Sequence, residues 1–169
     1  MDHPPSPSAP DLHRNARAVV EAARSLGLAV EVREFPEGTR TAEDAARAIG
    51  VSVGQIVKSL IFRVDDDVVV AFVSGPNRLD GARLATAAGR PGAAIARVDA
   101  AGVRAATGFP IGGVPPFGHP QPLATYVDED LLAFDEVWAA AGTPRHVFAV
   151  APGDLVRVTG GRVATLRAG

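Results

Sequence analysis

A single lysine and a segment rich in glycine and proline are the features of this sequence whose residue types could do chemistry. Lys58 is the only lysine among 17 Lys and Arg residues, and it lies in an apolar stretch, 53–62, that holds no other charge. Exposed positions accept arginine for lysine readily, whereas a site that needs a compact ammonium with an adjustable pKa does not. Lys58 is therefore a candidate functional cation. The alternative is a lysine at the polar edge of a half-buried strand, with its stem along apolar surface.

The second feature is segment 108–120, which contains four Gly and four Pro. This composition excludes a helix or a central strand. Consecutive Gly112 and Gly113 permit positive φ and close approach of the backbone to a ligand, so their N–H groups could converge on an anion or an oxyanion. We interpret the segment as a ligand-binding loop, with a rigid helix-to-strand connection as the alternative. Neither a P-loop nor a GxGxxG dinucleotide motif is present.

The composition also excludes several other kinds of site. Cysteine is absent, which excludes disulfides, thiolate nucleophiles and cysteine-based metal sites. The four His residues show no metal-ligand spacing, and the three consecutive Asp at 65–67 predict a solvated turn rather than a metal site. No apolar run approaches the roughly 18 residues of a membrane helix. The net charge is -2, so a nucleic acid would have to meet a local basic patch.

The length of 169 residues suits one domain with a sizeable core. We expect residues 1–10, which are rich in Pro and Ser, to be a disordered tail, and residues 11–169 to form the domain. The first residues lack the basic-then-apolar order of a signal peptide, so we expect a cytoplasmic protein.

Periodicity and turn residues predict the elements that must position the lysine and the loop. Apolar spacing and capping residues predict helices at 12–26, 41–50, 80–88, 99–107 and 152–158, and residues 128–130 are expected to cap a further helix. Runs rich in β-branched residues predict strands at 29–35, 55–64, 68–74, 93–98, 123–127, 136–140, 146–150 and 162–166. The second and third of these strands form a hairpin. This order predicts an α+β domain around a curled, mixed but mostly antiparallel sheet with surrounding helices.

Residues 57–62 (VKSLIF) and 107–119 (TGFPIGGVPPFGH) resemble the YbaK/EbsC family of aminoacyl-tRNA deacylases, which is related to the editing domain of bacterial prolyl-tRNA synthetases. The resemblance extends over residues 28–160. It implies the fold of that family and hydrolysis of the ester that joins a wrong amino acid to the 3′-terminal adenosine of tRNA. The implied partners are the 3′-aminoacyl end of tRNA, in particular tRNA for proline carrying alanine or cysteine, and a prolyl-tRNA synthetase. No cofactor, metal, membrane or DNA partner is implied.

The resemblance also implies the residues that do the chemistry. The family's functional lysine matches Lys58, and its glycine-rich loop matches Gly112, Gly113 and Pro116. An aminoacyl ester is already activated, so the site needs only to position water and stabilise an oxyanion. Lys58 is expected to hold the terminal phosphate or ribose, or to polarise the ester carbonyl. The N–H groups of Gly112 and Gly113 are expected to bind the oxyanion.

Three further side chains are substrate-binding candidates. Ser59 follows the lysine, where relatives also place a small polar residue. Ser74 begins a Ser-Gly-Pro-Asn-Arg segment, which forms either the rim of the site or an ordinary turn. His119 follows the loop, in a region where some alanine-specific relatives use a histidine, and it is either a side-chain base or a loop histidine. Candidate phosphate contacts are Arg40, Arg78 and Arg145.

Two questions stay open on the sequence. Relatives that remove cysteine often carry a tyrosine near the end of the first strand, where this chain has Phe35, so the candidate amino acids are alanine and cysteine, then serine or threonine. A non-catalytic tRNA-binding or regulatory module with the same pocket, and a small-molecule amino acid or ester hydrolase, are alternative functions. Lys58 favours catalysis, because a site without turnover could drift to arginine.

Overall fold

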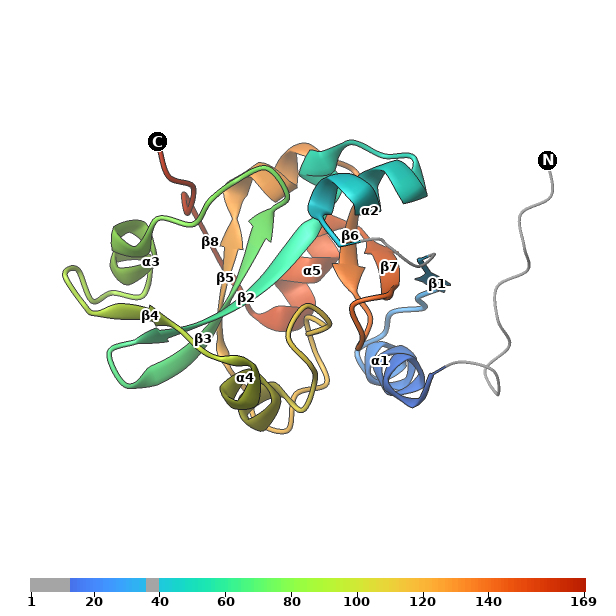
Figure 1. Ribbon diagram of the computed structural model, residues 1–169, viewed down its shortest axis with the longest axis horizontal. Coiled ribbons are helices and arrows are strands. Elements are labelled where there is room, and N and C mark those ends of the chain that lie inside the picture. Colours follow the sequence, from blue (N-terminus) through green and yellow to red (C-terminus); the bar gives the residue numbers. More distant parts are fainter. Residues whose placement is uncertain (1–12, 36–39) are drawn as a thin grey trace.

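The computed structural model describes residues 13–35 and 40–169, and the expected tail at 1–10 lies outside them. Two β-sheets form its centre, a five-stranded sheet in the order β4-β2-β3-β5-β8 and a three-stranded sheet in the order β1-β7-β6. Figure 1 shows the three-stranded sheet, α1 and α2 at one end of the molecule and α3 at the other. The strands are β1 (Val32–Glu34), β2 (Val57–Val64), β3 (Asp67–Ser74), β4 (Ile95–Arg97), β5 (Ala124–Asp128), β6 (Val137–Ala140), β7 (His146–Val150) and β8 (Arg162–Ala164).

The long hairpin of β2 and β3 is the backbone of the larger sheet. The two strands pair antiparallel from Val57 opposite Ser74 to Val64 opposite Asp67, which confirms the predicted hairpin and its Asp turn. β4 pairs antiparallel only with 62–64 of β2, so no described strand pairs with the first half of β2 on that side, and we refer to this stretch as the free edge of β2. β5 and β8 extend the other side in parallel.

The smaller sheet is antiparallel throughout. One isolated parallel bridge, between Ile56 and Trp138, joins it to the start of β2. The two sheets together therefore form the curled and mostly antiparallel arrangement that the sequence predicts. The strand expected from residue 55 starts later, because the Gln55 side chain accepts a hydrogen bond from the Ser52 N–H at 3.1 Å and closes a 3₁₀ turn.

Local caps define the helices, as expected. Thr41 and Asp44 form the predicted capping box, Asp80 and Asp99 accept hydrogen bonds from the first turns of their helices, and Asp128 caps a 3₁₀ helix. The helices are α1 (Arg14–Ser25), α2 (Ala42–Ile49), α3 (Gly81–Ala87), α4 (Ala100–Thr107) and α5 (Pro152–Thr159), with 3₁₀ turns η2 (Val53–Gln55) and η3 (Glu129–Ala133). Among the described residues, no helix has the length and apolarity needed to span a membrane.

Side chains on the two faces of β2 enter different cores. Val57 and Ile61 pack with α1 and the smaller sheet, while Phe62 and Val64 pack on the opposite face with α3, as the two-residue alternation of a strand requires. A third cluster lies beneath α2 and is formed by Phe35, Ala45, Ala46, Ile56, Trp138 and Val147. Five of these six residues, all except Ala46, line a single cavity and form its floor.

Candidate active site

A cavity of about 290 Å³ lies where the free edge of β2 faces α2, β6 and β7. The floor is apolar and includes Phe35, Trp138 and Val147. The Ile61 carbonyl accepts a hydrogen bond from the Val98 N–H at 3.1 Å, so the main chain of Ile61 points toward the β4 edge. By the alternation of an antiparallel strand, the N–H and C=O of Ser59 point to the same edge, where β4 does not reach them. The cavity wall thus offers backbone groups of Ser59 that have no hydrogen-bond partner among the described residues.

Lys58 lies in the wall of this cavity. Its side chain is partly buried, and its ammonium donates a hydrogen bond to the main-chain carbonyl of Asn77. Burial lowers the pKa of Lys58 below its ordinary value, while the carboxylates of Glu43 and Asp128 act in the opposite direction and Arg97 adds to the lowering. The ammonium retains two further N–H donors for a ligand.

The Gly/Pro loop reaches the cavity through Ile111 and Gly112. Gly112 has φ +81°, in the left-handed region, and among the described residues its N–H donates no hydrogen bond. The N–H of Gly113 instead donates to the Pro110 carbonyl at 2.9 Å, and the Gly113 carbonyl accepts from Gly142 at 3.0 Å. Of the two glycines, Gly112 is therefore the one whose donor is available to a ligand.

Gly113 has a packing role that only glycine can fill. A Cβ at this position would lie 2.6 Å from both the Cα and the carbonyl carbon of Thr143. Thr143 itself lines the cavity. The missing side chain of Gly113 thus lets the loop lie directly against the turn between β6 and β7.

Two buried polar atoms beside the cavity have no hydrogen-bond partner in the described residues. These atoms are the Ser59 hydroxyl oxygen and the Trp138 indole nitrogen, and both residues line the cavity. An unsatisfied buried polar group costs roughly 1–3 kcal/mol. Proteins keep such an unsatisfied group where it has a function, for example where a bound ligand supplies the missing hydrogen-bond partner.

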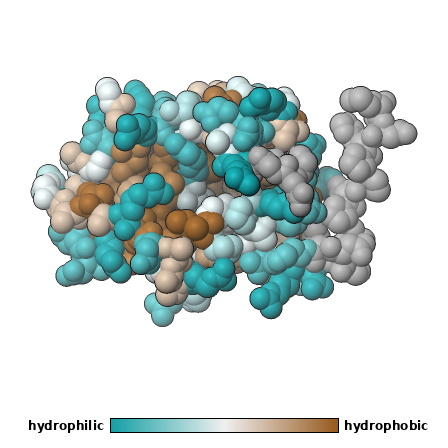
Figure 2. Space-filling model, in the orientation of Figure 1, coloured by the Kyte–Doolittle hydropathy of each residue, from teal (hydrophilic) through white to brown (hydrophobic). Residues whose placement is uncertain are grey.

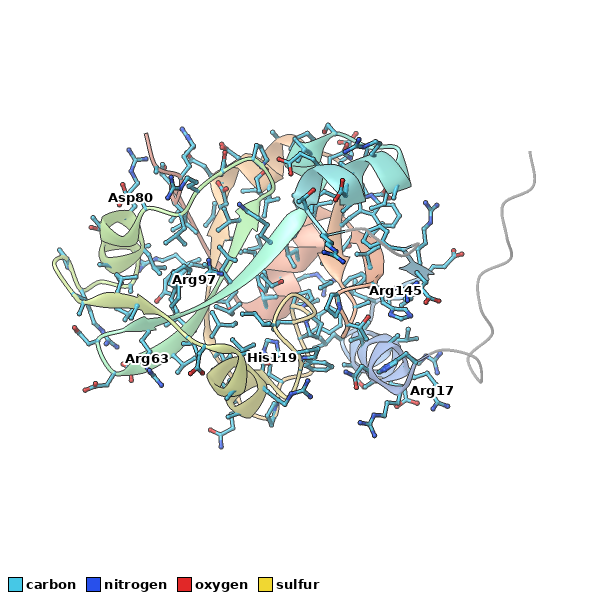
Figure 3. All side chains as sticks on the ribbon, in the orientation of Figure 1. Arg17, Arg63, Asp80, Arg97, His119 and Arg145 are labelled. Carbon is cyan, nitrogen blue, oxygen red and sulfur yellow. The ribbon has the colours of Figure 1, made fainter. Side chains whose placement is uncertain are left out.

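The charged residues that line the cavity are all basic. They are Arg40, Lys58 and Arg97, and no Asp or Glu occurs among the described lining residues. Arg97 lies where β4 meets β2 (Figure 3), with its guanidinium carbon 5.7 Å from the centre of the Phe62 ring. Neither Arg40 nor Arg97 forms an ion pair within the described part of the chain. The wall can therefore attract an anion.

The surface beside the loop is apolar. Figure 2 shows hydrophobic residues gathered in the middle of this face and bordered by hydrophilic ones. Ile111, which lines the cavity, keeps 47% of its surface exposed. The cavity entrance thus combines basic groups with apolar surface, which suits a ligand that has both phosphate and flat apolar parts.

The structure separates the remaining candidates from the cavity. Ser74 is buried, and its hydroxyl donates to the Gly54 carbonyl at 2.6 Å. Pro116, within the Gly/Pro loop itself, is buried. His119 lies 2.7 Å, through Nε2, from the Pro115 carbonyl, and burial lowers the pKa of its imidazole. None of the three lines the cavity.

Of the three arginines considered as phosphate contacts, only Arg40 lines the cavity. Arg145 donates to the Phe35 carbonyl at 3.1 Å and lies 3.6 Å from the Glu34 carboxylate. Sequence reasoning did not find Arg97 or Trp138, because their positions in the sequence carry no motif. Only the pairing of β4 and β6 with neighbouring strands brings them to the site.

Comparison with known proteins gives the family. The profile of the Aminoacyl-tRNA editing domain matches residues 36–158. The uncharacterized protein YwhH of Bacillus subtilis is 33% identical over 126 residues, which cover 74% of this chain and 78% of that protein. The proline–tRNA ligase of Desulforamulus reducens is 31% identical over 106 residues, 60% of this chain and 18% of the ligase.

A solved structure, described as a candidate trans-editing enzyme for prolyl-tRNA synthetase, agrees over nearly the whole chain. It superposes with a TM-score of 0.88 at 46% sequence identity and covers 94% of this chain and 100% of that one. The family profile covers well over half of the sequence and includes Lys58, the free edge of β2 and the Gly/Pro loop. The chain belongs to the aminoacyl-tRNA editing domain family.

Proposed function

We propose that this protein hydrolyses the ester bond of mischarged aminoacyl-tRNA as a free-standing editing enzyme. The observation that carries the proposal is the convergence of Lys58 and the Gly112 N–H on one cavity whose described charged residues are all basic. That N–H has no partner in the part of the chain that the structure describes. Family membership makes an aminoacyl ester the first substrate to consider. Such an activity would operate where tRNA is charged, in the cytoplasm.

In the proposed mechanism, water attacks the ester carbonyl carbon. The Ser59 carbonyl, at the free edge of β2, accepts a hydrogen bond from this water, and the Gly112 N–H and the Lys58 ammonium stabilise the oxyanion. The bond from the carbonyl carbon to the ribose oxygen then breaks, and that oxygen takes the proton that the water loses. The products are the free amino acid and uncharged tRNA. Gly113, whose N–H is already donated to Pro110, supports the loop rather than the oxyanion.

The cavity floor supports a small and uncharged amino acid as the group removed. Phe35, Trp138 and Val147 present apolar surface, and Phe35 has no hydroxyl with which to recognise a polar side chain. We therefore propose alanine or cysteine attached to tRNA for proline. We expect only modest discrimination against serine. An apolar pocket rejects a substrate with an added hydroxyl by about 10²-fold in kcat/KM at most.

The function is tested by incubating catalytic amounts of the protein with tRNA for proline charged with alanine, cysteine, serine or proline. We expect alanyl or cysteinyl ester to be lost faster than in buffer, while prolyl-tRNA stays intact. Release of the amino acid over many turnovers supports an enzyme. Binding of the charged tRNA without turnover would instead favour the regulatory binding module, and turnover of free amino acid esters alone would favour a small-molecule hydrolase.

We also expect Arg97→Ala to weaken the salt dependence of this reaction. The Arg97 guanidinium has no ion-pair partner in the described residues, so we propose that it contacts a phosphate near the 3′ end. Losing one phosphate contact to single-stranded RNA should reduce the slope of log(kcat/KM) against log[salt] by about 0.7. The measurement is kcat/KM at several salt concentrations with subsaturating charged tRNA.

Arg63→Ala is the matched control for this measurement. Arg63 is exposed on β2, outside the cavity lining. It pairs with Ala96, one residue along from the Phe62–Arg97 pair, so its side chain points to the opposite face of the sheet from that of Arg97. Both variants change the net charge equally, so a general field effect would alter both slopes alike. Equal slopes for the two variants would contradict a phosphate contact by Arg97. The net charge of -2 also leaves room for a prolyl-tRNA synthetase partner that supplies further affinity for tRNA.

A further inference from the structure

The ammonium of Lys58 is tied to a segment of the chain outside the cavity lining. Its hydrogen-bond acceptor is the main-chain carbonyl of Asn77, in the connection between β3 and α3. A main-chain carbonyl fixes the ammonium only if the segment that carries it is itself held in place. Main-chain hydrogen bonds hold part of this segment, from the Asn77 N–H to the Ser74 carbonyl at 2.9 Å and from the Ala168 N–H to the Arg78 carbonyl at 2.8 Å. The side chain of Asn77 adds an anchor to the end of β5.

The Asn77 amide nitrogen donates to two carboxylates. It lies 2.8 Å from an oxygen of Asp128 and 2.7 Å from an oxygen of Asp130. Asp128 is fully buried and accepts two further hydrogen bonds, from the N–H groups of Ser74 and Asp130, both at 3.0 Å. Both oxygens of Asp128 are thus bonded, and the end of β5 is joined to the segment that holds Lys58.

Asp128 is unusual among the acidic residues here, because it is completely buried without an ion pair in the described part of the chain. Burying a charge in this way is costly. The adjacent acids, Glu129 and Asp130, instead pair with Arg167 at 2.9 and 3.1 Å. Asp128 is instead held by three hydrogen bonds, from Asn77, Ser74 and Asp130.

We propose that Asn77 and Asp128 are positioning residues for Lys58, with Asp128 fixing Asn77 and Asn77 fixing the ammonium at the cavity wall. The consequence for catalysis rests on the proposed function, while the effect on Lys58 itself does not. Asn77 and Asp128 do not line the cavity, so they act through the lysine and not on the substrate.

Electrostatics gives Asp128 a second effect on the lysine. The charged groups that act on Lys58 are Glu43 from α2, Asp128 at the end of β5 and Arg97 from β4. Burial lowers the pKa of Lys58, and the two carboxylates oppose that lowering. Removal of the Asp128 charge should therefore lower the pKa of Lys58 further. Removal of the Asn77 side chain should instead free the ammonium without removing a charge.

The single lysine makes a direct experiment possible. Protein grown with ¹³C,¹⁵N-lysine carries one labelled side chain, because Lys58 is the only lysine. Its Cε and Nζ shifts, followed against pH by NMR, give the pKa of Lys58, and the relaxation of Cε gives its mobility. We expect Asp128→Asn to lower the pKa and Asn77→Ala to raise the mobility. Asn77→Ala should also reduce deacylation, on the scale of up to about 10²-fold that small misplacements cost.

Asp130→Asn is the matched control, because Asp130 also accepts from Asn77 but is not among the groups that set the pKa of Lys58. It should leave that pKa nearly unchanged. Circular dichroism shows whether Asp128→Asn folds. If it does not, the proposal is tested by the mobility of Lys58 in Asn77→Ala. An unchanged pKa in folded Asp128→Asn, or unchanged mobility in folded Asn77→Ala, would overturn the proposal. Altered lysine signals in a protein that deacylates no tRNA would overturn the proposed function alone.

Discussion

Replacing Lys58 by alanine is expected to lower kcat/KM for the mischarged tRNA by about 10²-fold or more, the usual scale for the loss of one electrostatic stabiliser. The ammonium is the cation that the structure holds in place at the cavity wall, through Asn77. A methyl group leaves neither charge nor donor there. The measurement is deacylation of tRNA charged with alanine or cysteine, under conditions where the wild type turns over repeatedly.

Lys58→Arg separates positive charge from shape in the same assay. Arginine keeps the charge but replaces a compact ammonium with a planar guanidinium, which does not fit the same bond to the Asn77 carbonyl. We expect it to recover little of the lost activity. Arg63→Ala removes an exposed charge from the same strand and should retain nearly all of the wild-type activity. Wild-type turnover by folded Lys58→Ala would refute the proposed mechanism.

Replacing Gly113 by alanine is expected to damage both stability and activity. The new Cβ would overlap main-chain atoms of Thr143 at 2.6 to 2.8 Å, and neither segment can move aside as a flexible side chain would. Overpacking of this kind costs about 1–3 kcal/mol. Each kcal/mol lowers Tm by about 2–4 °C in a domain of this size. Because Gly112 immediately precedes Gly113, the displaced loop also misplaces the proposed oxyanion donor, so kcat should fall.

Gly153→Ala serves as the control for that substitution. Gly153 lies in the first turn of α5, where an added Cβ meets nothing within 4 Å. Alanine suits a helix better than glycine by up to about 1 kcal/mol, so this variant should be as stable as the wild type or more so. Thermal unfolding and deacylation of the two variants should therefore differ clearly. A Gly113→Ala protein with the wild-type Tm and kcat would show that the loop does not need this close contact.

The elements could be predicted from the sequence because the signals that define them are local. Thr41 and Asp44 lie three residues apart and form the capping box in the structure, and the Asp run turns the β2–β3 hairpin. The strand expected at 29–35 is shorter in the structure, as β1. Its length depends on how much of it finds β7 as a partner, which is a contact distant in sequence.

Of the residues proposed for the site from the sequence, the structure brings only some to one cavity, for the same reason. Lys58, Ser59 and Gly112 line that cavity, and their proposed roles rest on their residue types and the family resemblance. Ser74 and His119 looked equally suitable in the sequence, yet their polar groups bond to main-chain carbonyls away from the cavity. A side chain's type says which bonds it can make. The surrounding fold decides whether protein or ligand makes them.

The sequence by itself determined the helices, the strands, the turn residues and the one lysine that merits attention, because caps, periodicity and composition act over a few residues. Only the tertiary structure decided that β4 stops short along β2 and leaves a free edge, and that Arg97 and Trp138 meet Lys58 around one cavity. It alone left the Gly112 N–H without a partner among residues 13–35 and 40–169 and gave Gly113 a packing contact. These features depend on strand pairing and on close packing between segments far apart in the chain, and no local pattern encodes such contacts.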